Sequence, residues 1–134
     1  MTETSELDKD TSATVLVVED DQPLLEFFSA LLRREGYRIL VAANGVEALA
    51  IANNSLDDRI DILLSDVAMP YMGGIRLAEM VRETWPAIKV LLISALPYKE
   101  IMNRCDPSFI YHFLAKPMSV SGLSGKLRDI SASN

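Results

Sequence analysis

Three acidic side chains follow directly after an apolar segment near the start of this chain. The segment Thr14–Val18 is rich in β-branched residues, and Glu19, Asp20 and Asp21 come next. A second apolar run ends in another acid, Asp66. Two carboxylates about 4 Å apart repel each other by about 4 kcal/mol at an effective dielectric constant near 20, so a cluster of them calls for a cation. Oxygen ligands without His or Cys favour a hard divalent ion, and one or two carboxylates plus waters suit Mg²⁺.

Two other apolar runs end in side chains of different chemistry. The run Lys89–Ser94 ends in a hydroxyl group, and Phe109–Ala115 is followed by Lys116 and Pro117. If these runs are parallel strands, their carboxyl ends meet at one edge of a sheet. A hydroxyl and an ammonium group then join the acids there.

Strand and helix patterns alternate along the chain. Short apolar runs predict five strands over Thr14–Val18, Arg38–Ala42, Ile60–Ser65, Lys89–Ser94 and Phe109–Ala115. Apolar residues spaced three and four apart predict helices over Pro23–Gly36, Asn44–Asn53, Pro97–Arg104 and Ser119–Ile130, and one that follows Gly74 and is ended by Pro86. This alternation indicates an α/β fold, with a doubly wound five-stranded parallel sheet flanked by five helices. Ligands of such sheets bind beyond the carboxyl ends of the strands, where the acids, the hydroxyl and the ammonium group lie.

Length and composition limit the classes of protein to consider. With 134 residues, 49% of them hydrophobic and 24% charged, the chain suits one globular domain. The net charge of −6 argues against direct nucleic-acid binding, which needs an excess of Lys and Arg on one face. A single cysteine and the lack of a signal peptide or an apolar run of about 18 residues predict a cytoplasmic protein with no membrane partner. Residues 1–13 hold four acids and one lysine, which predicts a flexible acidic leader before a folded domain over 14–131 and a tail over 132–134.

Four short motifs carry a resemblance to a known family. They are Val17-Val18-Glu19-Asp20, then Leu64-Ser65-Asp66 followed by Met69-Pro70 and Gly74, then Ile93-Ser94-Ala95, and finally Lys116-Pro117. In this order and spacing they resemble the receiver domain of bacterial two-component response regulators, from about Thr14 to Ile130. The resemblance implies a flavodoxin-like, CheY-like sheet with the strand order 2-1-3-4-5. It also implies a signalling switch rather than an enzyme that acts on other substrates.

The resemblance assigns roles to the acids. It implies that Asp66 accepts a phosphoryl group from a histidine kinase or a histidine phosphotransfer protein. It also implies that Mg²⁺ is held by Glu19, Asp20, Asp66 and the backbone carbonyl of Ala68. A carboxylate that attacks phosphorus needs the transferring oxygens to be neutralised, and a metal on one side with an ammonium group on the other meets that need.

The resemblance also assigns roles to the response that follows phosphorylation. Ser94 matches the hydroxyl that binds a phosphoryl oxygen, and Lys116 matches the lysine that pairs with it, with the bond to Pro117 expected to be cis. Phe113 matches an aromatic switch position, although a permanently buried strand residue is an equal alternative. Because an aspartyl phosphate carries about two charges, we expect the surface of the fourth helix, the fifth strand and the fifth helix to repack and bind a partner.

Three features depart from the family pattern. Ala68 and Leu96 are apolar where many members carry polar groups that orient the hydrolytic water, so we expect a long-lived phosphoryl group. Gly73 stands where an Asp is common, which we expect to alter only a helix cap. The stretch 104–110 lacks the small residues usual before the fifth strand, so we expect the helix before it to be short or displaced.

Several alternatives stay open at the level of sequence. Asp21 is interpreted as a helix cap rather than a ligand, and His112 as a surface or packed residue rather than a phosphodonor. A Mg²⁺-dependent phosphohydrolase with Asp66 as nucleophile would need an acid two residues later, where the chain has Ala68. A degenerate receiver that acts only as a binding module would fail to bind Mg²⁺. The cognate kinase, the downstream target or output domain, and a dimer linked to phosphorylation are not determined by the sequence.

Overall fold

The computed structural model describes residues 13–54 and 59–132. Within these ranges the chain forms a five-stranded parallel sheet with the order β2-β1-β3-β4-β5. The strands are β1 (Thr14–Val18), β2 (Arg38–Ala42), β3 (Ile62–Asp66), β4 (Lys89–Ser94) and β5 (Tyr111–Ala115). The expected doubly wound α/β fold with the strand order 2-1-3-4-5 is confirmed.

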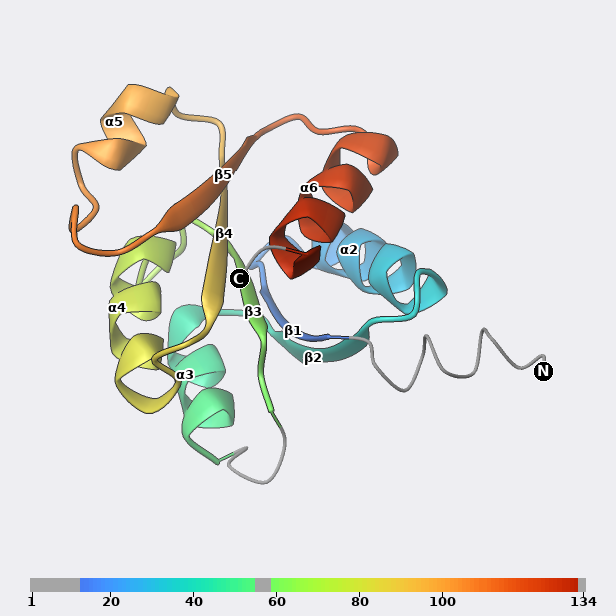
Figure 1. Ribbon diagram of the computed structural model, residues 1–134, viewed down its shortest axis with the longest axis horizontal. Coiled ribbons are helices and arrows are strands. Elements are labelled where there is room, and N and C mark those ends of the chain that lie inside the picture. Colours follow the sequence, from blue (N-terminus) through green and yellow to red (C-terminus); the bar gives the residue numbers. More distant parts are fainter. Residues whose placement is uncertain (1–12, 55–58, 133–134) are drawn as a thin grey trace.

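Helices cover both faces of the sheet (Figure 1). On one face lie α2 (Gln22–Arg34) and α6 (Val120–Ala132). On the other face lie α3 (Gly45–Asn54), α4 (Gly74–Thr84) and α5 (Tyr98–Met102).

Across the described ranges, no helix is both long enough and apolar enough to cross a membrane.

Side chains of the strands pack into two apolar clusters, one under each layer of helices. On β1, Leu16 belongs to the cluster under α3 and α4, whereas Val15 and Val17 belong to the cluster under α2 and α6. Parallel strands connected by helical crossovers are buried on both faces in this way. Each such side chain contributes about 1.5–3 kcal/mol when it is fully buried. This burial holds the carboxyl ends of the strands in a defined register.

Capping contacts fix where the helices begin after the strands. The Asp21 carboxylate accepts a hydrogen bond from the N–H of Leu24 (3.2 Å), which confirms its role as the cap of α2. At α3, the side-chain oxygen of Asn44 accepts from the N–H of Glu47 (2.7 Å). The Glu47 carboxylate in turn accepts from the N–H of Ala43 (2.6 Å), one residue before the cap. The contacts to the N–H groups of Leu24 and Glu47 satisfy backbone donors that the first turn of a helix leaves unpaired.

The segment before β5 is less regular than the sequence pattern predicts. The Asp106 side chain accepts a hydrogen bond from the N–H of Ser108 (2.9 Å), and the Asp106 carbonyl accepts from the N–H of Phe109 (3.1 Å). This turn occupies the segment, so β5 begins at Tyr111 instead of Phe109. Helix α5 has only five residues, which confirms that the helix before β5 is short.

Strand β3 also begins later than expected, at Ile62 rather than Ile60. The N–H of Thr14 donates to the Asp61 carboxylate (2.9 Å), so a side chain takes the place of a backbone partner at this end of the sheet. Ile60 is nevertheless buried in the apolar cluster under α3 and α4. The apolar character of Ile60 therefore reflects its burial. A residue can be buried without pairing with a neighbouring strand.

The predicted leader and tail lie largely outside the described residues. Of residues 1–13 only Ala13 is described, and its carbonyl accepts a hydrogen bond from the N–H of Arg38 (3.1 Å). Of residues 132–134 only Ala132 is described, as the last residue of α6.

Candidate functional site

The register of the sheet brings the predicted site residues to one edge. Glu19 and Asp66 stand side by side, because the residues before them pair between β1 and β3. The N–H of Lys116, just after β5, donates to the carbonyl of Ser94 at the end of β4 (2.9 Å). Residues far apart along the chain therefore share the carboxyl edge of the sheet.

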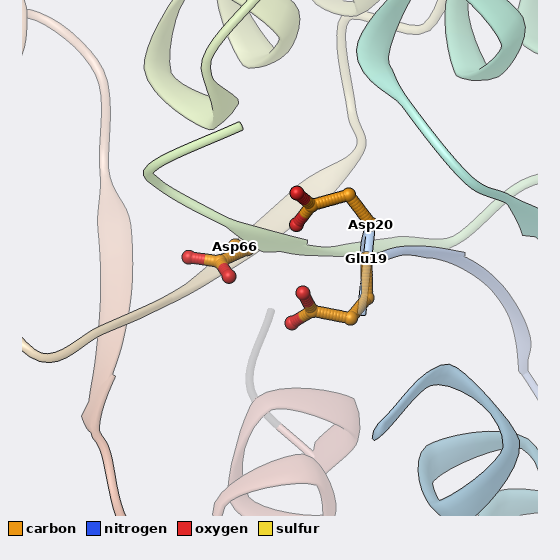
Figure 2. A group of neighbouring side chains, drawn as sticks. All are labelled: Glu19, Asp20 and Asp66. Carbon is orange, nitrogen blue, oxygen red and sulfur yellow. The ribbon is translucent and has the colours of Figure 1, made fainter. Parts of the chain in front are cut away.

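Glu19, Asp20 and Asp66 point toward one common space (Figure 2). One carboxylate oxygen of each residue lies within 4.8 Å of the others. Glu19 and Asp66 are buried, with 1% and 7% of their surfaces exposed, whereas Asp20 is exposed. A donor set made of carboxylate oxygens, open to water on one side, fits a hard divalent cation that keeps part of its hydration shell.

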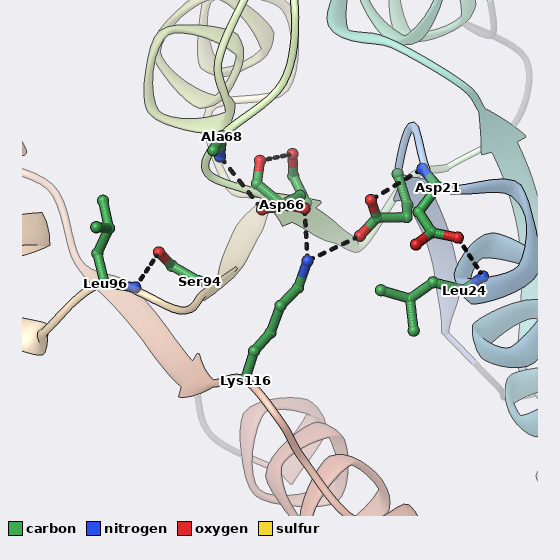
Figure 3. A network of polar contacts seen from close by, with 9 residues as sticks. Asp21, Leu24, Asp66, Ala68, Ser94, Leu96 and Lys116 are labelled. Atoms are coloured by element: carbon green, nitrogen blue, oxygen red, sulfur yellow. Dashed lines mark hydrogen bonds and ion pairs between the residues drawn. The ribbon is translucent and has the colours of Figure 1, made fainter.

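The Lys116 ammonium group lies between two of these carboxylates (Figure 3). Its Nζ donates to Asp66 Oδ2 at 2.7 Å and to Glu19 Oε1 at 3.4 Å. Burial alone would lower the pKa of Lys116, but the hydrogen bond and charge of Asp66, together with the charge of Glu19, raise it above its usual value. Lys116 therefore stays charged and pairs with two of the three clustered carboxylates, those of Glu19 and Asp66.

Glu19 is the acid whose ionisation is most disfavoured. Its pKa is raised from 4.5 to about 7, chiefly because the carboxyl group is buried, and the charge of Asp66 acts in the same direction. A hydrogen bond from the N–H of Asp21 to Glu19 Oε2 (3.1 Å) and the charge of Lys116 oppose this shift. A cation beside Glu19 would favour its ionised form.

Backbone contacts hold Asp66 in place. Its Oδ1 accepts a hydrogen bond from the N–H of Ala68 (3.2 Å), and its backbone carbonyl accepts from the buried Ser65 hydroxyl (2.9 Å). A Cβ atom on Gly74 would collide with the Asp66 carbonyl, so glycine permits the close approach of α4 to the end of β3. The metal-binding role expected for the Ala68 carbonyl stays a prediction.

The two predicted switch residues have partners in the segment between β4 and β5. Ser94 is 2% exposed, and its hydroxyl accepts a hydrogen bond from the N–H of Leu96 (2.9 Å). Figure 3 shows this hydroxyl turned toward Leu96 rather than toward Asp66. Phe113 is half-buried and packs edge-on against Tyr98 of α5, with ring centroids 5.5 Å apart and ring planes at 67°.

Three other residues singled out from the sequence play local roles. The bond between Lys116 and Pro117 is cis, as expected. His112 is half-buried on β5, and burial followed by nearby cations lowers its pKa, as for a packed histidine. Cys105 packs against the cluster under α3 and α4, and burial raises the pKa of its thiol, which makes it a poor nucleophile.

Sequence reasoning missed one residue beside the site and one in the loop that follows β3. The Ser65 hydroxyl holds the carbonyl of Asp66, but a serine in an apolar strand gives no signal of such a role. Tyr71 follows Pro70 in the loop after β3, with 95% of its surface exposed and φ at 70°. Proline indicates a turn, but only coordinates show that a bulky residue adopts this left-handed conformation.

Comparisons with known proteins agree with this geometry. The family model for the response regulator receiver domain matches residues 15–128. The chain is 35% identical over 119 residues to the sensor kinase CckA of Brucella abortus (strain 2308), covering 89% of this chain and 12% of that protein. It is 39% identical over 115 residues to the probable transcriptional regulatory protein TcrX of Mycobacterium tuberculosis, covering 86% of this chain and 48% of that protein. The chain thus spans less than half the length of these curated relatives.

Solved structures show the same fold. The chemotaxis protein CheY4 of Vibrio cholerae has a TM-score of 0.80 at 29% identity, covering 90% of this chain and 99% of that one. The receiver domain of the hybrid histidine kinase CckA has a TM-score of 0.74 at 31% identity, covering 88% and 98% of the two chains. A CheX–CheY complex with BeF3 and Mg²⁺ from Borrelia burgdorferi has a TM-score of 0.80 at 26% identity, covering 90% of each chain. The family match over most of the sequence, the strand order and these relatives show that the chain belongs to the response regulator receiver domain family of two-component signalling.

Proposed function

We propose that Asp66 is the phosphoacceptor of this receiver domain. The observation that carries the proposal is the position of its carboxylate, which is buried, hydrogen-bonded to Lys116 at 2.7 Å, and clustered with Glu19 and Asp20. An aspartate that only capped the end of a strand would need no more than one hydrogen-bond partner. Asp66 instead lies where a cation on one side and an ammonium group on the other neutralise oxygens that approach it.

The proposed reaction is the transfer of a phosphoryl group from a phosphohistidine. An oxygen of the Asp66 carboxylate forms a bond to phosphorus, the bond between phosphorus and the imidazole nitrogen breaks, and the leaving imidazole takes a proton from water. Lys116 keeps its charge because its pKa is raised, so it neutralises one of the transferring oxygens without giving up a proton. The donor is a histidine kinase or a histidine phosphotransfer protein.

Glu19, Asp20 and Asp66 are the side chains that would hold Mg²⁺, together with the carbonyl of Ala68. Support comes from the oxygen-only donor set and from the raised pKa of the buried Glu19, whose charge a cation would stabilise. When bound, Mg²⁺ supplies further neutralisation of the transferring oxygens. The similar CheY of Borrelia burgdorferi, whose complex contains Mg²⁺ and BeF3, supports the same assignment.

The response to phosphorylation begins at Ser94. Its hydroxyl leaves the N–H of Leu96 and binds a phosphoryl oxygen, which shifts the segment between β4 and β5. Because Phe113 packs against Tyr98 of that segment, the aromatic pair rearranges as well. The surface of α5, β5 and α6 then binds a downstream protein, a second copy of this domain or an output domain.

The domain catalyses only its own phosphorylation and dephosphorylation. A phosphohydrolase would need an acid at position 68 to protonate leaving groups, and the residue there is Ala68. The similarity to a sensor kinase of Brucella abortus supports a histidine-kinase pathway as the setting. The single cysteine supports a reducing, cytoplasmic compartment.

Treatment with acetyl phosphate and Mg²⁺ tests the phosphoacceptor directly. Intact-mass measurement is expected to show one phosphoryl adduct on the wild-type chain and none on Asp66→Ala, because the Asp66 carboxylate is the one that Lys116 holds at 2.7 Å and that we propose as the nucleophile. Asp21→Asn is the matched control, since it keeps a helix cap and should keep the adduct. An adduct of equal size on Asp66→Ala would contradict the proposal.

We further propose that the phosphoryl group is long-lived. The Ala68 side chain is exposed and Leu96 packs toward the core, so neither presents a polar group to a hydrolytic water. The aspartyl phosphate of the wild-type chain is expected to persist for minutes or longer without a phosphatase. Ala68→Asn should shorten that lifetime, and wild-type decay within seconds would contradict the expectation.

A further inference from the structure

The loop between β3 and α4 presents an aromatic side chain to solvent. Tyr71 is 95% exposed, more than any other large hydrophobic residue that the structure describes. Its φ of 70° lies in the left-handed region, which is unfavourable for a bulky side chain. An exposed ring contributes little to a core, and a strained backbone costs free energy, so neither feature stabilises the fold. A residue held in such a conformation points to a function outside the fold itself.

Contacts on both sides of Tyr71 hold the loop in place. The N–H of Met72 donates to the carbonyl of Pro70 at 2.7 Å. The N–H of Gly74 donates to the carbonyl of Val67 at 2.9 Å and closes the loop. The Met72 side chain packs against the apolar cluster under α3 and α4. A partner that binds the Tyr71 ring therefore needs to order little backbone, which favours binding.

The loop has the composition of the centre of a protein interface. Residues 67–75 carry no charged side chain, in a chain that is 24% charged, and they contain one tyrosine and two methionines. Ala68 and Pro70 are exposed along with Tyr71. The buried centres of protein interfaces are depleted in charged residues and enriched in tyrosine and methionine. The loop is therefore an uncharged, apolar surface beside an acidic site.

This surface lies close to the proposed phosphoacceptor. The N–H of Ala68 donates to the Asp66 carboxylate (Figure 3), and Gly74 packs against the Asp66 carbonyl. Tyr71 is three residues from Gly74, which span at most about 11 Å, so its backbone lies within about 15 Å of Asp66. A standard interface buries about 800 Å² on each partner, a patch of about 16 Å radius. A protein that centres such a patch on Asp66 covers Tyr71 as well.

We propose that Tyr71 is a specificity-determining contact for the protein that donates the phosphoryl group. Its ring packs against apolar side chains beside the phosphohistidine of that protein. The inference rests on the proposed function of Asp66. A phosphohistidine protein suits this surface better than a downstream target, because the donor has to reach Asp66 itself. A small donor such as acetyl phosphate reaches Asp66 without covering the loop.

Phosphotransfer from protein donors, compared with labelling by acetyl phosphate, tests this inference. Each histidine kinase of the organism that encodes this chain is autophosphorylated with radiolabelled ATP and mixed with the full chain, and the fastest donor is kept. Tyr71→Asn is expected to lower kcat/KM for that donor by about tenfold. The loss should lie in KM, because the contact is absent from the ground state and the transition state alike. Labelling by acetyl phosphate should not change.

Three comparisons separate a contact with the donor from a defect in the fold. Asparagine adopts the left-handed conformation readily, so Tyr71→Asn should keep or raise the midpoint of urea unfolding. Tyr71→Phe keeps the ring and should keep the rate of transfer. Ile110→Asn is the matched control, since Ile110 is 75% exposed and precedes β5, at the opposite edge of the sheet from Asp66. It should leave transfer from the kinase unchanged.

Equal rates for the wild-type chain and Tyr71→Asn with the protein donor would overturn the inference. Equal slowing with acetyl phosphate would also overturn it, since the effect would then lie in the site itself. Labelling of the wild-type chain by acetyl phosphate but by none of the kinases would exclude the proposed contact as well. A change of oligomeric state without a change in transfer would assign the ring to a second copy and contradict the inference. If neither acetyl phosphate nor a kinase labels the wild-type chain, the proposed function of Asp66 fails too, which distinguishes the two failures.

Discussion

Glu19 differs from the other acids of the site in its solvation. Asp20 is exposed and Asp66 is hydrogen-bonded to Lys116 at 2.7 Å, whereas Glu19 is 1% exposed and 3.4 Å from that ammonium group. Its pKa of about 7 is the consequence. Near neutral pH the Glu19 carboxyl group therefore exchanges between a protonated and an ionised form. The protonated form is favoured when no cation is bound, and the ionised form is favoured by a bound cation.

The Mg²⁺ affinity of the wild-type chain is expected to depend on pH through Glu19. Binding requires the carboxylate, so affinity should be highest above pH 7 and should weaken by about tenfold one unit below the pKa. Without metal, the stability of the fold depends on pH in the opposite direction. The folded chain holds a proton up to about pH 7 that the unfolded chain releases near 4.5, so stability falls as pH rises through this window.

Calorimetric titration with Mg²⁺ at several pH values, and urea unfolding without metal, measure the two effects. Glu19→Gln is expected to flatten both pH profiles and to weaken Mg²⁺ binding at all pH values. A wild-type affinity that stays constant between about pH 6 and pH 8 would show that the Glu19 pKa lies elsewhere.

At the scale of elements, one arginine of α4 holds the segment that leads into β5. The guanidinium carbon of Arg82 lies 4.5 Å from the ring centroid of Phe109 and 5.0 Å from that of Tyr111. Its Nη2 donates to the carbonyl of Ile110 at 2.7 Å. These contacts fix an irregular segment that has neither a long helix nor small turn residues to define it.

Arg82→Met is expected to lower the free energy of unfolding by about 2 kcal/mol, from one hydrogen bond and two cation–π contacts. Urea denaturation measures this change. Arg76→Met is the matched control on the same helix, since that arginine is exposed and, among the described residues, pairs only with Glu79, at 3.3 Å. It should change stability by about 0.5 kcal/mol or less. Equal effects of the two substitutions would show that the contacts of Arg82 do not stabilise the segment before β5.

At the scale of the whole molecule, the acidic cluster joins the ends of β1 and β3. A ligand that binds only the folded chain stabilises it by about 2.7 kcal/mol at a concentration one hundred times its dissociation constant. Mg²⁺ should therefore raise the melting temperature of the wild-type domain. Asp20→Asn should abolish most of this rise, because it removes an exposed carboxylate of the proposed Mg²⁺ site without disturbing the core, while Asp21→Asn should keep it. A rise of the same size in Asp20→Asn would place the binding elsewhere.

The sequence by itself determined the order of the strands and helices and named residues that the sheet brings to one edge. The core runs Thr14–Val18 and Lys89–Ser94 are β-strands as predicted, because the burial of an apolar run is a local pattern. Asp66 and Lys116 could be named from their places at strand ends, since parallel strands deliver those ends to one edge. Where local turn chemistry competed with apolar character, as before β5, the pattern overestimated the strand.

Only the tertiary structure decided how these groups act on one another. Lys116 and Glu19 are 97 residues apart, and their contact at 3.4 Å follows from sheet register rather than from any spacing. Other properties likewise depend on burial and on packing in three dimensions. They are the pKa of Glu19, the orientation of the Ser94 hydroxyl toward Leu96, and the hydrogen bond from Arg82 to the carbonyl of Ile110. Such quantities arise from packing in three dimensions. A linear pattern of residue types does not specify which individual pairs of side chains come into contact.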